Sequence, residues 1–509
     1  MRDNVSLSVT HAVSRREVLG ISETRCRIYC YDLAAMDTPP ELARRRRRAD
    51  AAHNAERIMR AANDVLLAEP DASIEEVAEA AGVSRATVYR HFRTRDDLVK
   101  LVREQSGALV DANVHDALRP PGELAGGPTP MDVAGVLNKV PPHLLGEQIV
   151  AEAQRLAGES SVALYLVDID GTLLLRLAGS EEFPEELPVP LAVGPEIPRE
   201  GLPALRALVA DELPGSIVAP LLLRGRAIGV LLAVNAPEAP LLDLARHAAA
   251  ALELGGRYSD VFAATRRRRE TSAAAEIQQN LLPPRIVRIA GGVLAGNVLP
   301  GYEIGGDWFD YTENSDGAWI GVADSKGSGT TAAALGTVSL GAFRAKRRAG
   351  GSLAEIAVAI DQTVREVDVA GAFVNVILAQ WHGPSSVFRW VNCAHNAPLL
   401  VSAEGELREL DGPAQPALGI GDTPDVTVRE RRLVRGERLL LLSDGVLERR
   451  ARHGRPFGMA GVRAAVARSG TGAAATVRAI EDAIASASAD PLEDDATIVV
   501  FAPSTPLDS

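Results

Sequence analysis

The chain has 509 residues, 46% of them hydrophobic and 24% charged, which excludes a wholly disordered protein and predicts roughly three domains. Its net charge of −13 excludes a protein that coats nucleic acid over its whole surface. Three cysteines are too few for a disulfide framework, and neither a signal peptide nor an apolar run of about 20 residues is found, so we expect a cytoplasmic protein without membrane contact.

Residues 1–40 lack a sustained hydrophobic period, and we expect a disordered extension there. Met36 stands directly before the first helical segment, so the sequence leaves open whether the residues before it are translated. Cys26 and Cys30 have the spacing of two ligands on one helix. A structural zinc ion needs four ligands, so we favour an ordinary segment without metal.

Short capped helices are predicted in residues 41–107, which we expect to form an all-α head. Ser73 with Glu76 has the pattern of a capping box, Ser84 precedes the next helix, and Thr94 with Asp97 repeats the capping pattern. The apolar residues at helical spacing, which we expect in the core, are Ile58, Ala62, Val65, Leu66, Ile74, Val77, Ala78, Val88 and Phe92.

The sequence AAGVS and the run T-x-Y-R-x-F lie between Ile58 and Val102, and this segment resembles the TetR-type helix-turn-helix. The resemblance implies that the helix Ser84–His91 enters the major groove of DNA. It places four side chains near bases or phosphates: Arg85, Thr87, Tyr89 and Arg90. The basic run Arg44–Arg48 is either a solvated charge run or a phosphate-contacting arm. The helical dimer domain of TetR proteins is missing, so we expect a homodimer formed elsewhere in the chain.

A linker rich in Pro and Gly, residues 108–135, precedes two predicted β-hairpins. The first spans Val162–Gly179 around an Asp-Gly turn, and the second spans Ile217–Val234. With these hairpins, flanking helices and the run RGRAIGVLLAV, residues 136–258 resemble an α/β GAF-like sensor domain. The resemblance implies either a small-molecule ligand or a ligand-free relay. With no cysteine and only two histidines, haem has little support.

A long helical segment is predicted from Leu241 to Leu282, weakened at Gly255 and Gly256 and ended by Pro283. Four of its apolar residues lie on one stripe: Leu242, Ala245, Ala249 and Leu252. We expect this stripe to hold the homodimer, with residues 259–285 as a helical linker to the last domain.

Residues 286–504 alternate strands with helical segments, such as 352–368 and 459–486, and place Asp beside Gly or another Asp at the ends of apolar runs. The four places are IGGDWFD (Ile304–Asp310), IGVADSKGSG (Ile320–Gly329), LLLLSDGVLE (Leu439–Glu448) and LEDDATIVVF (Leu492–Phe501). One such motif is an ordinary turn, but four that converge would form an all-oxygen site for Mg²⁺ or Mn²⁺. Two such ions acidify a bridging water and stabilise displacement at phosphorus, which predicts hydrolysis of a phosphate ester.

The motifs occur in the order EIQQNLLPP, GGDWFD, ADSKGSG followed by Ala332 and Ala333, NCAH, SDG, FG and DDAT. In this order, residues 276–502 resemble the SpoIIE/RsbU-type branch of the metal-dependent serine/threonine protein phosphatases, the PPM or type 2C family. The resemblance implies an α+β domain, a β-sandwich flanked by helices, with two Mn²⁺ or Mg²⁺ ions.

The resemblance also implies which residues act. It assigns metal binding and catalysis to Asp307, Asp324, Asp444 and Asp494, with Asp495 as the alternative to Asp494 and the Ser325 carbonyl as a main-chain ligand. Three residues depart from the family pattern: Ala323 and Ala394 replace glycines, and Ser328 replaces His or Lys. We expect His395 to be structural and Asp310 to lie behind the ligands.

The multidomain chain is therefore predicted to be a metal-dependent protein phosphatase with a DNA-binding head and a sensor. The resembled branch implies a phosphorylated anti-sigma-factor antagonist as the protein substrate, in bacterial signalling. The alternative is a DNA-binding transcription regulator whose phosphatase-like domain is inactive and binds a partner. A third interpretation treats the helix-turn-helix as a protein-interaction domain.

Overall fold

The computed structural model describes residues 58, 61–62, 73–83, 85, 87–88, 135–158, 160–300, 305–367, 369–410, 412, 415–421, 425–452 and 454–504. The chain divides into two compact units, residues 1–125 and residues 126–509, which are considered in turn. The predicted extension 1–40, with Cys26 and Cys30, and the basic run Arg44–Arg48 lie outside the described residues.

The N-terminal unit contains the helix α4 (Ile74–Ala80), which begins after Ser73. The Glu76 amide donates to the Ser73 hydroxyl at 3.3 Å, and the Ser73 amide donates to the Glu76 carboxylate at 2.6 Å, so the predicted capping box is confirmed. One apolar cluster contains Ile58, Ala62, Ile74, Val77, Ala78 and Val88, as predicted, and also Ala81, which was not predicted. The other predicted core and capping residues, Val65, Leu66, Ser84, Phe92, Thr94 and Asp97, lie outside the described residues.

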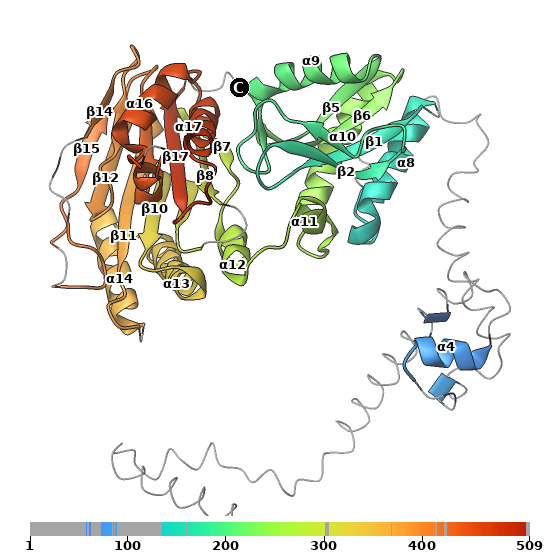
Figure 1. Cartoon of the computed structure of the whole chain (residues 1–509), viewed down its shortest axis with the longest axis horizontal. Helices are drawn as coiled ribbons and strands as arrows, with labels where there is room; N and C mark the ends of the chain where they lie inside the picture. Colours follow the sequence, from blue (N-terminus) through green and yellow to red (C-terminus); the bar gives the residue numbers. More distant parts are fainter. Residues whose placement is uncertain are drawn as a thin grey trace, which may run out of the picture. The chain divides into compact units, whose positions relative to one another are not determined.

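The second unit begins with a central domain built on an antiparallel sheet (Figure 1). Its strands are β1 (Val162–Val167), β2 (Leu173–Gly179), β3 (Glu186–Pro188), β4 (Ile197–Pro198), β5 (Ser216–Leu223) and β6 (Arg226–Val234). The order is β3-β2-β1-β6-β4, with β5 also paired to β6. The pairs β1–β2 and β5–β6 are the two predicted hairpins, which are confirmed.

Helices cover both faces of this sheet. They are η1 (Pro142–Leu144), α8 (Leu145–Ala157), η2 (Arg199–Gly201), α9 (Leu202–Glu212) and α10 (Glu238–Gly255). Leu164 of β1 packs in one apolar cluster with α8 and α10, and the next residue, Tyr165, packs in another with α9. This alternation follows from the strand period of two, and it explains why β1 is buried along its whole length.

The stripe that was expected to hold a homodimer belongs to this core. Ala245 and Ala249 are fully buried, Leu252 is 4% exposed, and Leu242 packs against the same cluster. The expectation of a dimer surface on this stripe is therefore wrong, because the sheet of the same domain covers it.

The predicted long helix is divided into three. After α10 come α11 (Val261–Thr265) and α12 (Ala273–Leu281). The first break follows Gly255, where the sequence predicted weakness, and the end of α12 before Pro283 is also as predicted. The second break was not predicted; Ser272, whose hydroxyl accepts from the Ala275 amide, starts a new helix there.

The C-terminal domain has two antiparallel sheets and five helices among the described residues (Figure 1). Its strands are β7 (Ile286–Ile289), β8 (Gly292–Leu299), β9 (Trp308–Asn314), β10 (Gly317–Ser325), β11 (Val374–His382), β12 (Val387–Cys393), β13 (Leu399–Val401), β14 (Leu407–Glu409), β15 (Arg429–Arg432), β16 (Arg438–Leu442) and β17 (Ala496–Pro503). Its helices are α13 (Gly329–Arg348), α14 (Leu353–Glu366), α15 (Asp444–Glu448), α16 (Gly458–Arg468) and α17 (Ala473–Ala487), and η3 (Gly383–Ser385) is a 3₁₀ turn.

The two sheets, β15-β12-β11-β10-β9 and β14-β13-β16-β17-β8-β7, pack face to face. Phe309 and Ile320 of the first sheet share a cluster with Leu441 and Phe501 of the second. The outer faces are covered by α13 with α14 on the first sheet and by α16 with α17 on the second. The predicted β-sandwich flanked by helices is therefore confirmed. Two details differ from the prediction: residues 459–486 form two helices rather than one segment, and α13 was not predicted.

The central and C-terminal domains meet at a buried ion pair. Glu196 lies 2.8 Å from Arg226 Nε and accepts a hydrogen bond from the Ile286 amide at 2.8 Å. Val193 packs in the same apolar cluster as Ile286. The first residue of β7 is thereby held against the loop that precedes β4.

Across the described part of the chain, no helix combines the length and apolarity needed to cross a membrane.

Candidate functional site

The four predicted carboxylates lie at the ends of strands from both sheets. Asp307 directly precedes β9, and Asp324 is the next-to-last residue of β10. Asp444 begins α15 just after β16, and Asp494 lies two residues before β17. Because β9 pairs with β10 and β16 pairs with β17, each sheet contributes two neighbouring strand ends to one region.

Two glycines allow the chain before Asp307 to contact helices on either side. A Cβ atom at Gly305 would lie 2.8 Å from the Ala274 carbonyl oxygen of α12, and one at Gly306 would lie 2.9 Å from the Ala332 Cβ of α13. Any side chain there would separate the Asp307 backbone from these helices. In the GGD motif, close packing against α12 and α13 accounts for the two glycines, and the carboxylate accounts for Asp307.

Asp307 and Asp324 lie in an environment that disfavours negative charge. Burial raises the pKa of Asp307 well above its usual value, and the charges of Asp495 and Asp324 raise it further. Burial also raises the pKa of Asp324 to about 6, and the charges of Asp444 and Asp494 add to that rise. Mutual repulsion among these carboxylates means that a cation placed among them would be stabilised.

The two last acids have different surroundings. Asp494 is exposed and acts on Asp324, whereas Asp495 is 2% exposed and acts on Asp307. The Asp495 Oδ2 atom accepts from the Asp307 amide at 3.1 Å, and burial raises the pKa of Asp495 to about 7. Asp495 thus accepts from the backbone amide of Asp307, whereas Asp494 interacts electrostatically with Asp324 and Asp444.

Three polar residues orient the carboxylates, and the sequence analysis did not identify them. Gln278 of α12 donates from Nε2 to Asp495 Oδ2 at 2.7 Å and to the Asp307 carbonyl at 3.0 Å. Thr497 Oγ1 donates to Asp307 Oδ2 at 2.5 Å, and Asn375 Nδ2 donates to Asp324 Oδ2 at 3.2 Å. Gln278 and Thr497 belong to the motifs EIQQNLLPP and DDAT, so their place in these motifs could have indicated a role at the site.

The donor set fits a hard divalent cation. It consists of oxygen atoms, it carries mutually repelling charges, and the buried Asp495 Oδ1 has no hydrogen-bond partner. Among the described residues, no three Asp, Glu, His or Cys side chains already stand at distances that would hold a metal. The two findings are compatible, because charges act over longer distances than the 2.0–2.6 Å or so of a metal–oxygen bond.

Ser325, predicted as a main-chain ligand, is 2% exposed and its hydroxyl has no hydrogen-bond partner. Its carbonyl oxygen lies beside Gly306, within 3.3 Å of where a Cβ would stand, and so adjoins Asp307. Ser328 precedes α13 without a capping hydrogen bond from its side chain. This departure from the family pattern therefore places an exposed hydroxyl at the helix start.

The loop of the NCAH motif is closed by its own hydrogen bonds. The His395 amide donates to Asn392 Oδ1 at 2.9 Å, and Asn396 Nδ2 donates to the Leu442 carbonyl at 3.1 Å. His395 is 6% exposed, and burial lowers its pKa to about 4, so the imidazole is neutral at pH 7. The buried Nε2 atom of His395 has no hydrogen-bond partner, and the structural role expected for this residue stays a prediction.

Asp310 and Cys393 have structural surroundings. Asp310 forms ion pairs with Arg344 at 2.9 Å and Arg347 at 3.0 Å, so it joins β9 to α13 rather than supporting the carboxylates as expected. Cys393 is fully buried, and burial raises its thiol pKa to about 12. A thiol that stays protonated is a poor nucleophile.

Of the four residues predicted to contact DNA, two are described. Arg85 is helical and exposed, and Thr87 is helical and half-buried. Tyr89 and Arg90 lie outside the described residues.

Comparisons with known proteins agree with this architecture. The family model of stage II sporulation protein E (SpoIIE) matches residues 314–503, a range that includes Asp324, Asp444 and Asp494 and begins just after Asp307. The chain therefore carries a SpoIIE-type domain. The model of bacterial regulatory proteins of the tetR family matches residues 67–102, so the N-terminal unit carries a TetR-type segment. The GAF-like resemblance of the central domain stays a prediction.

Individual relatives match parts of the chain. Phosphoserine phosphatase RsbU of Bacillus subtilis is 22% identical over 186 residues, which cover 36% of this chain and 55% of that protein. The transcriptional regulator NfxB of Pseudomonas aeruginosa is 38% identical over 56 residues, 11% of this chain and 30% of that protein. The chain thus spans about half or less of the length of these curated relatives. Among solved structures, the SiaA-PP2C domain of P. aeruginosa is 24% identical, covers 45% of this chain and 94% of that one, and has a TM-score of 0.38.

Proposed function

We propose that the C-terminal domain hydrolyses phosphoserine or phosphothreonine on a protein, with two Mn²⁺ or Mg²⁺ ions as cofactors. The observation that carries this proposal is that Asp307, Asp324, Asp444 and Asp494 come from four strand ends, and that neighbouring acid charges help to raise the pKa of Asp307, Asp324 and Asp494. Oxygen donors with excess negative charge are the ligands that these cations prefer. The match to a protein named as a phosphoserine phosphatase supports the reaction class.

Each residue has a stated role in this proposal. Asp307, Asp324, Asp444, Asp494 and the Ser325 carbonyl would hold the ions. When bound, such ions activate water for attack on phosphorus and stabilise the developing charge. The chain itself fixes Asp307 through Thr497 and Gln278, and fixes Asp324 through Asn375. No side-chain nucleophile is proposed, so no phosphoenzyme should form and Cys393→Ser should keep its activity.

The substrate proposed from the family resemblance is a phosphorylated anti-sigma-factor antagonist. Since the matched relatives are covered only in part, this assignment needs a direct test. Dephosphorylation of a panel of phosphoproteins by the purified full chain, with and without Mn²⁺, identifies the substrate.

Asp324→Asn tests the metal-dependent mechanism. The change keeps the shape and removes one negative charge, so we expect phosphatase activity to fall by at least about 100-fold and metal affinity to fall with it. Chelation should abolish hydrolysis by the unmodified chain, and added Mn²⁺ should restore it. Asp482→Asn, at an exposed position on α17, is the matched control and should stay within about twofold. Full activity in Asp324→Asn contradicts the mechanism, and inactivity of the unmodified chain with metal favours the alternative of a partner-binding domain.

We also propose that the N-terminal unit binds duplex DNA, a proposal supported by the TetR-type match and the exposed, helical Arg85. Arg85→Ala should weaken binding of the full chain to genomic fragments. Loss of one phosphate contact lowers the slope of log affinity against log salt concentration by about one, whereas loss of a base contact weakens the preference for one DNA sequence over others. Arg246→Ala, with a side chain 64% exposed on α10, is the matched control. Binding that does not change with salt would leave only the protein-interaction interpretation.

A homodimer remains part of the proposal, because helix-turn-helix heads of this kind read two half-sites about 34–36 Å apart. Its surface must differ from the buried stripe of α10. Light scattering of the full chain measures the oligomeric state, and a monomer at the concentrations that bind DNA rules the dimer out.

A further inference from the structure

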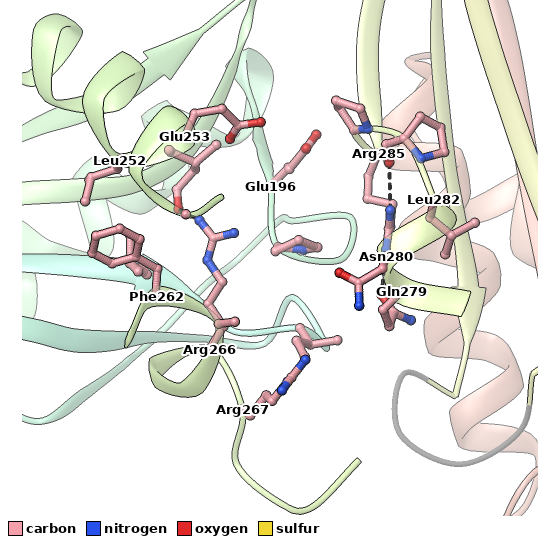
Figure 2. Close-up of a pocket in the computed structure, with 18 of the residues that line it drawn as sticks. Glu196, Leu252, Glu253, Phe262, Arg266, Arg267, Gln279, Asn280, Leu282 and Arg285 are labelled. Carbon is pink, nitrogen blue, oxygen red and sulfur yellow. Dashed lines mark hydrogen bonds between the residues drawn. The ribbon is translucent and has the colours of Figure 1, made fainter. Parts of the chain in front are cut away.

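A cavity of about 430 Å³ lies where the central domain, the residues 256–285 that follow it and the start of the C-terminal domain meet (Figure 2). One wall comes from β1, β6 and α10, another from α11 and the residues after it, and a third from α12 and the turn before β7. The volume is within the range of small-molecule sites. This place is separate from the carboxylates of the proposed phosphatase site, whose residues do not line it.

Two guanidinium groups in this cavity have no carboxylate partner. Arg285 is 5% exposed and donates only to neutral oxygens: Asn297 Oδ1 at 3.3 Å, the Pro283 carbonyl at 2.7 Å and Gln279 Oε1 at 2.7 Å. Arg266 donates to the Ile228 carbonyl at 3.3 Å, and its buried Nε has no hydrogen-bond partner. Burial lowers the pKa of both groups, that of Arg285 to about 10. An arginine guanidinium keeps its proton in proteins at pH 7, so both groups are cations.

The acids near the cavity are already engaged elsewhere. Glu196 pairs with Arg226 at 2.8 Å and accepts from the Ile286 amide. Glu253 lies 3.7 Å from the same Arg226, and Arg267 pairs with Glu276 of α12. Among the described residues no carboxylate lies within ion-pair distance of Arg266 or Arg285, although the charges of Glu196 and Glu253 act on Arg266 and those of Glu196 and Glu481 act on Arg285 from farther away. A buried cation without a counter-ion is unfavourable, and a bound anion would remove that cost.

The lining on the side of Arg266 is apolar. Leu252 and Phe262 are 4% and 5% exposed and face the same space, together with Ile228. Figure 2 shows Leu252 and Phe262 on the side of Arg266, across the cavity from Arg285. A ligand that fills this space must therefore combine an acidic group with an apolar body.

We propose that this cavity binds a small organic anion, with its phosphate or carboxylate group paired to Arg266 in the positive field of Arg285 and its apolar body against Leu252 and Phe262. A guanidinium binds either acidic group through the same paired hydrogen bonds, so the two sources share one chemistry. The ligand would contact both the central domain and the segment that leads through α12 into the C-terminal domain.

The test is titration calorimetry on the purified full chain, kept free of metal by a chelator. The probes are phenylphosphonate and benzoate, which supply the two acidic groups on one apolar body, with inorganic phosphate and benzyl alcohol as the partial ligands. We expect saturable binding of at least one of the first two, with tighter affinity than either partial ligand. Whichever of the two binds more tightly identifies the acidic group.

Arg266→Gln should weaken the better probe by about tenfold or more, the expected loss for a charged hydrogen bond. The matched control is Arg206→Gln, at an exposed position on α9, which should bind as the unmodified chain does. Ala263→Phe gives a second test, since Ala263 is exposed and lines the cavity, so a larger side chain blocks the space without entering the core. Absence of saturable binding, or equal affinity in Arg266→Gln, Ala263→Phe and the unmodified chain, overturns the proposal. If inorganic phosphate binds as tightly as the better probe, the proposed contact of an apolar body with Leu252 and Phe262 is overturned.

Discussion

At the scale of single residues, Ala394 shows how a departure from the family pattern affects the backbone. Its φ is +55°, in the left-handed region that glycine adopts freely and alanine does not. The hydrogen bonds of Asn392 and Asn396 hold the loop in this shape around His395. Alanine is thus kept in an unfavourable conformation by its neighbours.

Ala394→Gly should therefore stabilise the C-terminal domain. Relief of the left-handed strain, about 1–2 kcal/mol, exceeds the extra entropy of glycine, about 0.5–1 kcal/mol, so we expect a gain of roughly 0.5–1 kcal/mol. All four tryptophans lie in this domain, so their fluorescence during chemical denaturation reports its unfolding. Ala403→Gly, at an exposed turn position without positive φ, is the control and should not stabilise. A loss of stability in Ala394→Gly would contradict the argument.

At the scale of elements, α12 is the helix of the linker segment that contacts the carboxylates. Its Gln278 is 2% exposed and is the one residue of the helix that donates to both Asp495 and Asp307 in the described structure. Gln278→Leu keeps a similar size but leaves Asp495 Oδ2 with fewer donors. We expect weaker Mn²⁺ binding and lower activity, since outer partners of metal ligands are worth about 10–100-fold in affinity or activity.

The readout for Gln278→Leu is the Mn²⁺ concentration needed for half-maximal activity, which a purely structural loss would not shift. Ile277→Ala, at a position 38% exposed on the same helix, is the matched control and should behave as the unmodified chain. An unchanged metal requirement in Gln278→Leu would show that the hydrogen bonds do not position the site.

The same elements indicate what sequence could and could not predict. Strand ends with Asp were identified because their motifs are local, and the Ser73 capping box and the helix end at Gly255 follow from residues close together in the chain. The contact of Gln278 with Asp495 joins residues 217 positions apart, so it exists only once both sheets have packed. The stripe of α10 was correctly identified as apolar, but its pattern does not say whether a partner or the same domain covers it.

At the scale of the whole molecule, stability should depend on a buried acid outside the carboxylate site. Glu481 of α17 is 5% exposed and accepts from Asn297 Nδ2 of β8 at 2.7 Å. Burial raises its pKa from 4.5 to about 7, opposed by the Asn297 hydrogen bond and Arg478, while the charges of Asp482 and of Asp170 in the central domain add to the rise. Between pH of about 4.5 and 7, the folded chain therefore keeps a proton that the unfolded chain has released. The free energy of unfolding falls as pH rises through this window, and the stabilising contribution is lost above the folded pKa.

Glu481→Gln should flatten this part of the pH dependence. Glutamine stays neutral and can still accept from Asn297, so the variant should be more stable than the unmodified chain at pH 8, by on the order of 1–3 kcal/mol, and similar at pH 4.5. The measurement is chemical denaturation followed by tryptophan fluorescence from pH 4.5 to 8, with chelator present so that metal binding does not contribute. Asp324 and Asp495 change stability in the same direction in both proteins, so the difference between the curves isolates Glu481. Glu409→Gln, at an exposed position on β14 whose charge does not act on Glu481, should keep the original slope. An identical slope in Glu481→Gln would mean that Glu481 is ionised in the folded chain, with Arg478, 3.9 Å from its carboxylate, as the compensating charge.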